Sequence, residues 1–287
     1  LSRAVQRVLI RPEVSGVVVT QPADNIEETA YFVSISLSDV FQNQNSKPIV
    51  FTTCMNPEDP MFDGTKNLLD SIRVACHDVK GDISTVVVCM NGEIHAASRA
   101  QLTHTNKASA LASPGWGPVG YVDRDNVYFR CGALELDTGL NFPMLKKLTA
   151  KVPVVKAMCG DDGALLEMVL EKEPDAIIVE GFGRGNLPAG MMPAIKKAVK
   201  KGIFVVISTR ASSGRVLDST VFQGSVAQCL ECGCLLAGET TTSKARLLLM
   251  YVLSQKEAIQ LKKEDPERFF AYVQECLDPV LTNRLFG

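Results

Sequence analysis

The sequence has 287 residues, of which 46% are hydrophobic and 22% charged, and its formal net charge is −2. At roughly 150 residues per domain, this length allows one large or two medium domains, either of which can bury a substantial core. The balance of 30 basic against 32 acidic residues excludes a strong positive field, so we expect no nucleic-acid partner. No apolar run approaches the roughly 18 residues that span a bilayer, so we expect no membrane segment.

The nine cysteines are scattered and odd in number, which is typical of reduced buried thiols rather than of a secreted disulfide framework. We therefore expect an intracellular protein, either cytoplasmic or mitochondrial. Residues 1–11 are amphipathic, carry three arginines and lack acids, as a transit peptide does. We favour a short helix here, because Pro12 and Gly16 are helix-breaking residues that would end it before a strand at 17–20.

Short strands and helical segments alternate along the chain. The predicted strands are apolar runs without polar alternation, which is typical of strands buried on both faces of a parallel sheet. They lie at 17–20, 48–52, 85–90, 152–157, 176–180 and 204–208. The predicted helices lie at 26–37, 68–77, 163–171, 191–201, 225–232 and 266–277. This alternation predicts an α/β fold.

A stretch rich in glycine and proline, from about 91 to 150, interrupts the alternation. Gly92 and the 114–120 segment break regular elements, while 121–130 is typical of a hairpin. We therefore expect two α/β domains joined by a linker. The larger domain is predicted at 1–135, the linker at 136–151 and the smaller domain at 152–287.

Ligands of open parallel sheets bind beyond the carboxyl ends of the strands, which directs attention to the segments after Thr20, Thr52, Met90 and Glu180. The motifs there and farther along the chain are VVVTQPADNIEETAYF at 17–32, MNP at 55–57, DG at 63–64 with NL at 67–68, ASPGWGPVG at 112–120 and VEGFGRGNLP at 179–188. In this order, and over nearly the whole chain, they resemble motifs of the bacterial-type L-asparaginase/glutaminase family.

The resemblance implies a two-domain asparaginase-like architecture, with a larger flavodoxin-like parallel-sheet domain and a smaller α/β domain. It implies hydrolysis of a side-chain amide through an acyl-enzyme, without a cofactor. One Thr in the family's first strand is the nucleophile, and a second Thr works with a Lys and an Asp. The family's second-half loop faces a neighbouring subunit, which would place Asn186 against that subunit's substrate. We therefore expect a homo-oligomer or a subunit of a larger assembly.

Two catalytic positions depart from the family pattern. Ala23 stands where the second Thr belongs and Leu102 where the Lys belongs, and neither side chain can attack a carbonyl or transfer a proton. Asp24 aligns with the family's Asp and is expected to hold an ammonium group, with the Cys54 backbone as a further substrate-binding group. His104 lies beside the Lys position and is the one titratable side chain there that could replace it.

The family's first strand has no counterpart from Leu1 onward, so we expect another segment of the same polypeptide, or a partner chain, to complete the sheet. We interpret the chain as an asparaginase-family protein without catalytic activity that acts as a structural or regulatory subunit. Two alternatives stay open. One is an active L-asparaginase whose N-terminal segment lies outside this sequence, and the other is a sensor that binds Asp or Asn through Asp24.

Three cysteines at 229, 232 and 234 have a spacing that suggests metal binding, but no second Cys/His pair lies nearby to complete a tetrahedral site. We therefore favour a helix that ends near Gly233 and carries buried thiols. The sequence accordingly predicts no metal.

Overall fold

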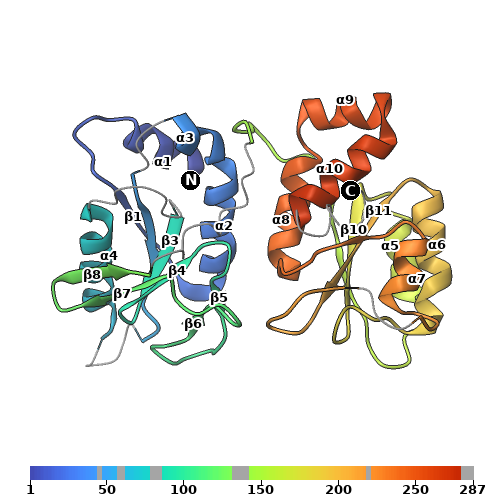
Figure 1. The fold of residues 1–287 in the computed structure, drawn as a ribbon, viewed down its shortest axis with the longest axis horizontal. Helices are drawn as coiled ribbons and strands as arrows, with labels where there is room; N and C mark the ends of the chain where they lie inside the picture. Colours follow the sequence, from blue (N-terminus) through green and yellow to red (C-terminus); the bar gives the residue numbers. More distant parts are fainter. Residues whose placement is uncertain (44–46, 57–61, 78–85, 131–141, 218–220, 279–287) are drawn as a thin grey trace. The chain divides into compact units, whose positions relative to one another are not determined.

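The computed structural model describes residues 1–287 except 44–46, 57–61, 78–85, 131–141, 218–220 and 279–287 (Figure 1). The chain divides into two compact units, Leu1–Met144 and Leu145–Gly287. Both are α/β structures. Residues 136–141 of the predicted linker lie outside the described residues, and so do Pro57 of the MNP motif and Thr85 at the start of a predicted strand.

The sheet of the N-terminal unit has the strand order β1-β2-β3-β4-β7-β8. Its first three strands are parallel, as predicted, with Thr20 of β1 in register with Thr52 of β2. The remaining pairs are antiparallel, so the sheet is mixed rather than wholly parallel. The strands are β1 (Val17–Thr20), β2 (Ile49–Thr52), β3 (Val86–Met90), β4 (Glu93–Ala96), β7 (Gly120–Asp123) and β8 (Asn126–Phe129).

The change from parallel to antiparallel pairing occurs at a two-residue turn, Asn91-Gly92. Both residues have positive φ, 53° and 77°, as a type I′ hairpin turn requires. Gly92 therefore turns the chain between two strands rather than ending regular structure, and β4 was missing from the predicted elements. The predicted hairpin at 121–130 is confirmed by β7 and β8.

Helices cover both faces of this sheet. Side chains of α1 (Ser2–Leu9) and α2 (Ile26–Ser36) pack with Phe51, Val86 and Val88 on one face. Alternate residues of the same strands, including Val50 and Val87, pack against α4 (Gly64–Cys76) on the other. This two-sided burial explains why these strands are almost entirely apolar. The unit also contains η1 (Ala23–Asn25), α3 (Ser38–Asn43), β5 (Gln101–Leu102) and β6 (Leu111–Ala112).

The C-terminal unit is built on a four-stranded sheet of order β12-β11-β10-β9, and every pairing in it is parallel. Its strands are β9 (Val154–Lys156), β10 (Ala176–Gly181), β11 (Phe204–Thr209) and β12 (Leu235–Leu236). Its helices are α5 (Ala164–Leu170), η2 (Ala189–Met191), α6 (Met192–Lys200), α7 (Val226–Glu231), α8 (Thr242–Val252), α9 (Lys256–Glu264) and α10 (Pro266–Leu277). Of these, α8 and α9 were not among the predicted helices.

Local capping explains where several of these helices begin. Asp265 accepts a hydrogen bond from the backbone N–H of Arg268 at 3.0 Å, and Pro266 occupies the first turn of α10. Ser225 caps α7 in the same way through the N–H of Gln228. Across the described residues, no helix combines the length and the apolar character needed to cross a membrane.

Candidate functional site

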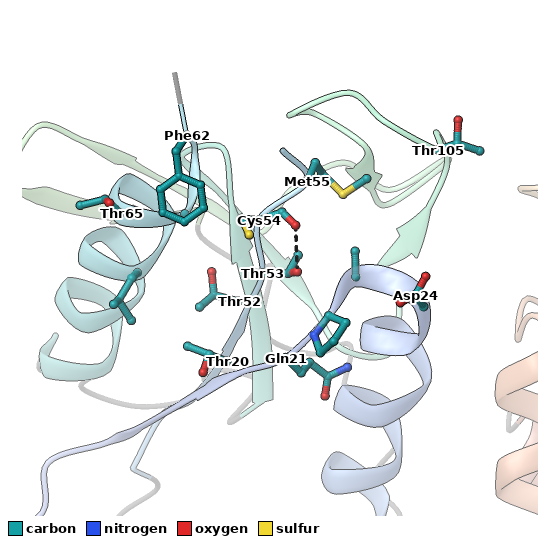
Figure 2. Close-up of a pocket in the computed structure, with 14 residues that line it drawn as sticks. Thr20, Gln21, Asp24, Thr52, Thr53, Cys54, Met55, Phe62, Thr65 and Thr105 are labelled. Carbon is teal, nitrogen blue, oxygen red and sulfur yellow. Dashed lines mark hydrogen bonds between the residues drawn. The ribbon is translucent and has the colours of Figure 1, made fainter. Parts of the chain in front are cut away.

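A cavity of about 720 Å³ opens at the carboxyl ends of β1 and β2, the edge of a parallel sheet where ligands bind in open α/β folds (Figure 2). Its hydroxyl groups belong to Thr20, Thr52, Thr53, Thr65 and Thr105. Its apolar side chains are those of Pro22, Ala23, Met55, Phe62 and Leu68. Gln21, Asp24, Cys54 and Gly64 complete the wall. The predicted residues Asp24, Ala23 and Cys54 therefore lie around one cavity.

The loop after β1 presents Asp24 to this cavity. Pro22 has the extended conformation φ −57°, ψ 152° and leads directly into η1, which is followed by α2. Gln21 braces the loop, since its side-chain nitrogen donates to Asn25 Oδ1 at 3.3 Å and to Thr29 Oγ1 at 3.4 Å. Asp24 is exposed at the rim of the cavity, where its carboxylate can meet a ligand without first being buried.

The loop after β2 is fixed by a carboxylate and an amide from α4 and the turn before it. Asp63 accepts from the backbone N–H of Met55 at 3.2 Å and of Asn56 at 3.4 Å. Asn67 is 1% exposed, and its side-chain nitrogen donates to the Thr53 carbonyl at 2.9 Å. These bonds hold Cys54 against the cavity, so Asp63 and Asn67 support the site, while Gly64 and Leu68 of the same two motifs line it.

Two hydroxyl groups of the wall are already engaged. Thr52 Oγ1 donates to the carbonyl of Cys89 at 2.9 Å, and Thr53 Oγ1 donates to the carbonyl of Cys54 at 3.3 Å. Thr52 therefore ties β2 to β3, while Thr53 occupies one lone pair of the Cys54 carbonyl, which is part of the backbone predicted to bind substrate. The other lone pair of that oxygen can still accept a hydrogen bond.

Leu102 does not line the cavity. Its side chain is half-buried against the core on the α1 and α2 face of the sheet, and its backbone N–H donates to Glu27 Oε2 at 2.6 Å. His104, two residues on, is exposed. Its Nδ1 accepts from the backbone N–H groups of Asn106 at 3.0 Å and Lys107 at 3.1 Å. The structure thus assigns His104 to its own turn, and only the neighbouring Thr105 reaches the cavity wall.

Asp24 is the only acidic side chain among the described residues of the wall, and none of them is basic. Cys54 adds a half-buried thiol. The described residues hold no cluster of three or more His, Cys, Asp or Glu side chains suited to a metal ion. What the arrangement offers chemically is one carboxylate, several hydroxyl groups and an apolar surface.

Asn186, the other predicted site residue, belongs to the C-terminal unit. It forms an isolated bridge with Phe182 just after β10, and its Oδ1 accepts from the backbone N–H of Val226 at 3.2 Å. Within its own unit it therefore fixes the first turn of α7. Its contact with a substrate of a neighbouring subunit stays a prediction.

The three clustered cysteines lie at the end of α7. Cys229 and Cys234 are buried and hydrogen-bonded to each other, and this bond lowers the pKa of Cys229 and raises that of Cys234. Burial raises the pKa of the half-buried Cys232. Gly233, with φ 90°, ends the helical turn as the sequence predicted.

The sequence did not identify the apolar wall of the cavity. Phe62, Thr65 and Leu68 come from the turn before α4 and from its first two turns, and Thr105 comes from the β5–β6 hairpin. A usable signal was the apolar character of the α4 surface, where Leu68, Leu69 and Ile72 are all exposed. In an amphipathic surface helix such positions are normally polar.

Residues 1–133 match the asparaginase N-terminal domain family, and residues 151–264 match the glutaminase/asparaginase C-terminal domain family. The L-asparaginase of Bacillus licheniformis is 30% identical over 265 residues, which make up 91% of this chain and 79% of that protein. The chain belongs to the glutaminase/asparaginase family.

Other similar proteins come from within the asparaginases and from a multi-subunit amidotransferase. A crystal structure of a probable cytoplasmic L-asparaginase from Campylobacter jejuni superposes with a TM-score of 0.79 and 26% identity, covering 96% of this chain and 82% of that one. A glutamyl-tRNA(Gln) amidotransferase subunit of Methanosarcina mazei is 27% identical over 269 residues, 91% of this chain and 60% of that protein. These matches confirm the two-domain asparaginase-like fold.

Proposed function

We propose that this member of the glutaminase/asparaginase family does not hydrolyse asparagine and acts as a structural or regulatory subunit. The observation that carries the proposal is the methyl group of Ala23 in the cavity wall, next to the retained Asp24. The family's second catalytic Thr is expected at this position. A methyl group can neither attack a carbonyl nor transfer a proton.

The described residues around the cavity supply no substitute for the missing groups. A hydroxyl nucleophile needs an adjacent base or a lowered pKa to attack at neutral pH. Leu102 is predicted at the position of the family's Lys, and its half-buried side chain packs against the core rather than lining the cavity. His104, the other candidate base, is bound within its own turn. Among the described residues the wall therefore has hydroxyl groups but no side-chain amine or imidazole to activate them.

A role within a larger assembly is supported by two observations. Relatives from Methanosarcina mazei and Pyrococcus horikoshii are named as subunits of a glutamyl-tRNA(Gln) amidotransferase. In addition, β1 is the last strand at one side of the N-terminal sheet, and its outer edge has no described partner strand. Because edge strands present unpaired N–H and C=O groups, we propose that a segment of the same polypeptide or of a partner chain pairs with β1.

Ammonia release from L-asparagine and L-glutamine by the full chain tests the loss of hydrolysis. We expect no release above the uncatalysed background. The competing function, an active L-asparaginase, is favoured by the names of the relatives and by the retained Asp24. It predicts turnover that is lost in Asp24→Asn. Calorimetry with L-aspartate addresses the third function, an amino-acid sensor, which predicts binding without turnover.

For the compartment, we propose an intracellular location. The described cysteines, eight in number, are all free thiols, as is usual in reducing compartments. The similar solved structure is also that of a probable cytoplasmic enzyme. Fractionation of the source cells with an antibody against the full chain tests this location, and recovery in a secreted fraction would contradict it.

A further inference from the structure

The turn between β3 and β4 contains an asparagine that is followed directly by a glycine. Among the asparagines of the sequence, only Asn91 precedes a glycine. Asn91 is exposed, and its side-chain amide has no hydrogen-bond partner among the described residues. Asparagine is a chemically labile residue, because the backbone nitrogen of the next residue can attack its side-chain carbonyl carbon. Water and the attacking nitrogen can therefore both reach this amide.

Gly92 leaves the approach to the Asn91 side chain open. Glycine has no Cβ and adopts a wide range of backbone angles, so its nitrogen can move toward the neighbouring side chain with little steric cost. The atoms nearest to the place of a Cβ at position 92 are the Val122 carbonyl oxygen, at 3.5 Å, and Lys66 Nζ, at 3.8 Å. No apolar side chain crowds this side of the turn among the described residues.

The surroundings of the turn hold the two reacting groups together and place a positive charge beside them. Asn67 Oδ1 accepts from the Asn91 N–H at 2.9 Å. The Gly92 carbonyl accepts from the Val122 N–H at 2.8 Å. Groups fixed next to each other react faster than free ones, because the entropy cost of bringing them together is already met. The Lys66 ammonium near Gly92 can stabilise the negative charge that develops on the attacked carbonyl oxygen.

We propose that Asn91 is a self-modification site, at which the chain converts its own asparagine to aspartate and isoaspartate. The Gly92 nitrogen forms a bond to Asn91 Cγ, the bond from Cγ to the amide nitrogen breaks, and the Gly92 proton leaves with that nitrogen as ammonia. Water then opens the resulting succinimide ring. Opening at Cγ gives aspartate, whereas opening at the backbone carbonyl gives isoaspartate, whose main chain runs through Cγ.

The isoaspartate product changes the contacts of Asn67. It lengthens the main chain of a turn whose flanking strands are paired right up to it, so residue 91 has to move away from Asn67. Asn67 also donates to the Thr53 carbonyl, next to Cys54 in the cavity wall. The modification therefore reaches the cavity through one buried side chain. The inference goes beyond the proposed function and holds whether or not the chain hydrolyses free asparagine.

The first test is incubation of the full chain in mildly alkaline buffer prepared with heavy-oxygen water, followed by peptide mass spectrometry. We expect heavy oxygen to enter residue 91 roughly tenfold faster, or more, than the exposed Asn106, which precedes Lys107. Isoaspartyl methyltransferase should label the same peptide. Equal rates at the two asparagines, or no incorporation at Asn91, would overturn the proposal. Each chain releases a single ammonia in this reaction, which distinguishes it from turnover of free asparagine.

The second test is iodoacetamide alkylation of Cys54 before and after the incubation, with the exposed Cys159 of the C-terminal unit as reference. Chains that carry isoaspartate should react roughly fivefold faster at Cys54, the factor that corresponds to one lost hydrogen bond, and at the same rate at Cys159. Asn91→Asp adds the charge without lengthening the main chain and should keep the original rate. An unchanged rate at Cys54 in the modified chain, or an equal rise in Asn91→Asp, would contradict the coupling through Asn67.

Discussion

The side-chain nitrogen of Asn67 donates a hydrogen bond of 2.9 Å to the backbone carbonyl of Thr53, one residue beyond the end of β2. The oxygen of the same amide accepts from the backbone N–H of Asn91 at 2.9 Å, one residue beyond the end of β3. One buried side chain on α4 thus joins the ends of two parallel strands, and one of those ends forms the cavity wall.

Replacing Asn67 by Ala should destabilise the N-terminal unit. The substitution leaves the Thr53 carbonyl and the Asn91 N–H without these partners, at a cost of about 2–4 kcal/mol for the pair. Urea unfolding followed by tryptophan fluorescence measures this effect in the correct unit, because Trp116 is the single tryptophan of the chain. Asn106→Ala, at an exposed site, is the matched control, and equal unfolding midpoints for both variants would refute the role of Asn67.

Glu27 has a positioning role that can be separated from that of its neighbour. Its carboxylate holds the Leu102 N–H at 2.6 Å and so ties the β5–β6 hairpin to α2. Glu27→Ala should lower the free energy of unfolding by about 1–3 kcal/mol, the range for hydrogen bonds to charged groups and for unsatisfied partners. Glu27→Gln keeps an acceptor oxygen and should recover part of the loss. Glu28→Ala is the control, and a loss as large as that of Glu27→Ala would contradict this assignment.

Protonation of the buried His95 should lower the free energy of unfolding in acid. Burial lowers its pKa below the ordinary 6.5, and the neighbouring Glu93 carboxylate opposes this shift only in part. Since the folded-state pKa lies below the unfolded value, the unfolded chain binds more protons, and stability falls as the pH drops from 6.5 through the folded pKa. His95 also contacts Ser113 Oγ through Nδ1 at 2.9 Å.

The measurement is the free energy of unfolding between about pH 7.5 and about pH 5.5, where few carboxylates titrate. The loss over this interval should be smaller in His95→Gln than in the wild-type chain, whatever the overall stability of the variant. An NMR titration gives the pKa directly, and a value at or above 6.5 for His95 would show that burial does not control this residue.

Thiol reactivity should follow the burial of each cysteine. Burial raises the pKa of Cys89 and of Cys276 to about 12, so that thiolate is scarce at neutral pH as well as inaccessible. Native-state alkylation read by mass spectrometry should modify the exposed Cys76 and Cys159 first and reach Cys89 and Cys276 only after denaturation. Early modification of Cys89 would contradict its place in the sheet.

The sequence pattern predicted most strands of the two parallel cores. It missed β4, where the pairing in the N-terminal sheet changes from parallel to antiparallel. Strands buried on both faces, such as β2 and β3, are apolar except for Thr52 and therefore stand out. β4 contains Glu93 and His95 and so carries no such signal, although the Asn91-Gly92 turn before it was a usable hairpin signature. The helices α8 and α9 follow one another closely after the last described strand, β12. No alternation of strands and helices therefore marked their positions in the sequence.

The site was predictable as far as it depended on strand ends and motif order. Asp24, Ala23 and Cys54 were expected near one another, and all three line one cavity. The direction of the Leu102 side chain, by contrast, depends on how the short β5–β6 hairpin packs on α2. The exposed apolar residues of α4, such as Leu68, were a sequence signal, but their position beside the strand ends depends on the tertiary placement of α4.

The most direct test of the account is an assay of the purified full chain for ammonia release from L-asparagine and L-glutamine. The L-asparaginase of Bacillus licheniformis, assayed in parallel, provides the positive control. The account predicts ammonia release that matches the protein-free background for both substrates. Release above background that disappears in Asp24→Asn would show that the cavity is a working amidohydrolase site despite Ala23 and Leu102.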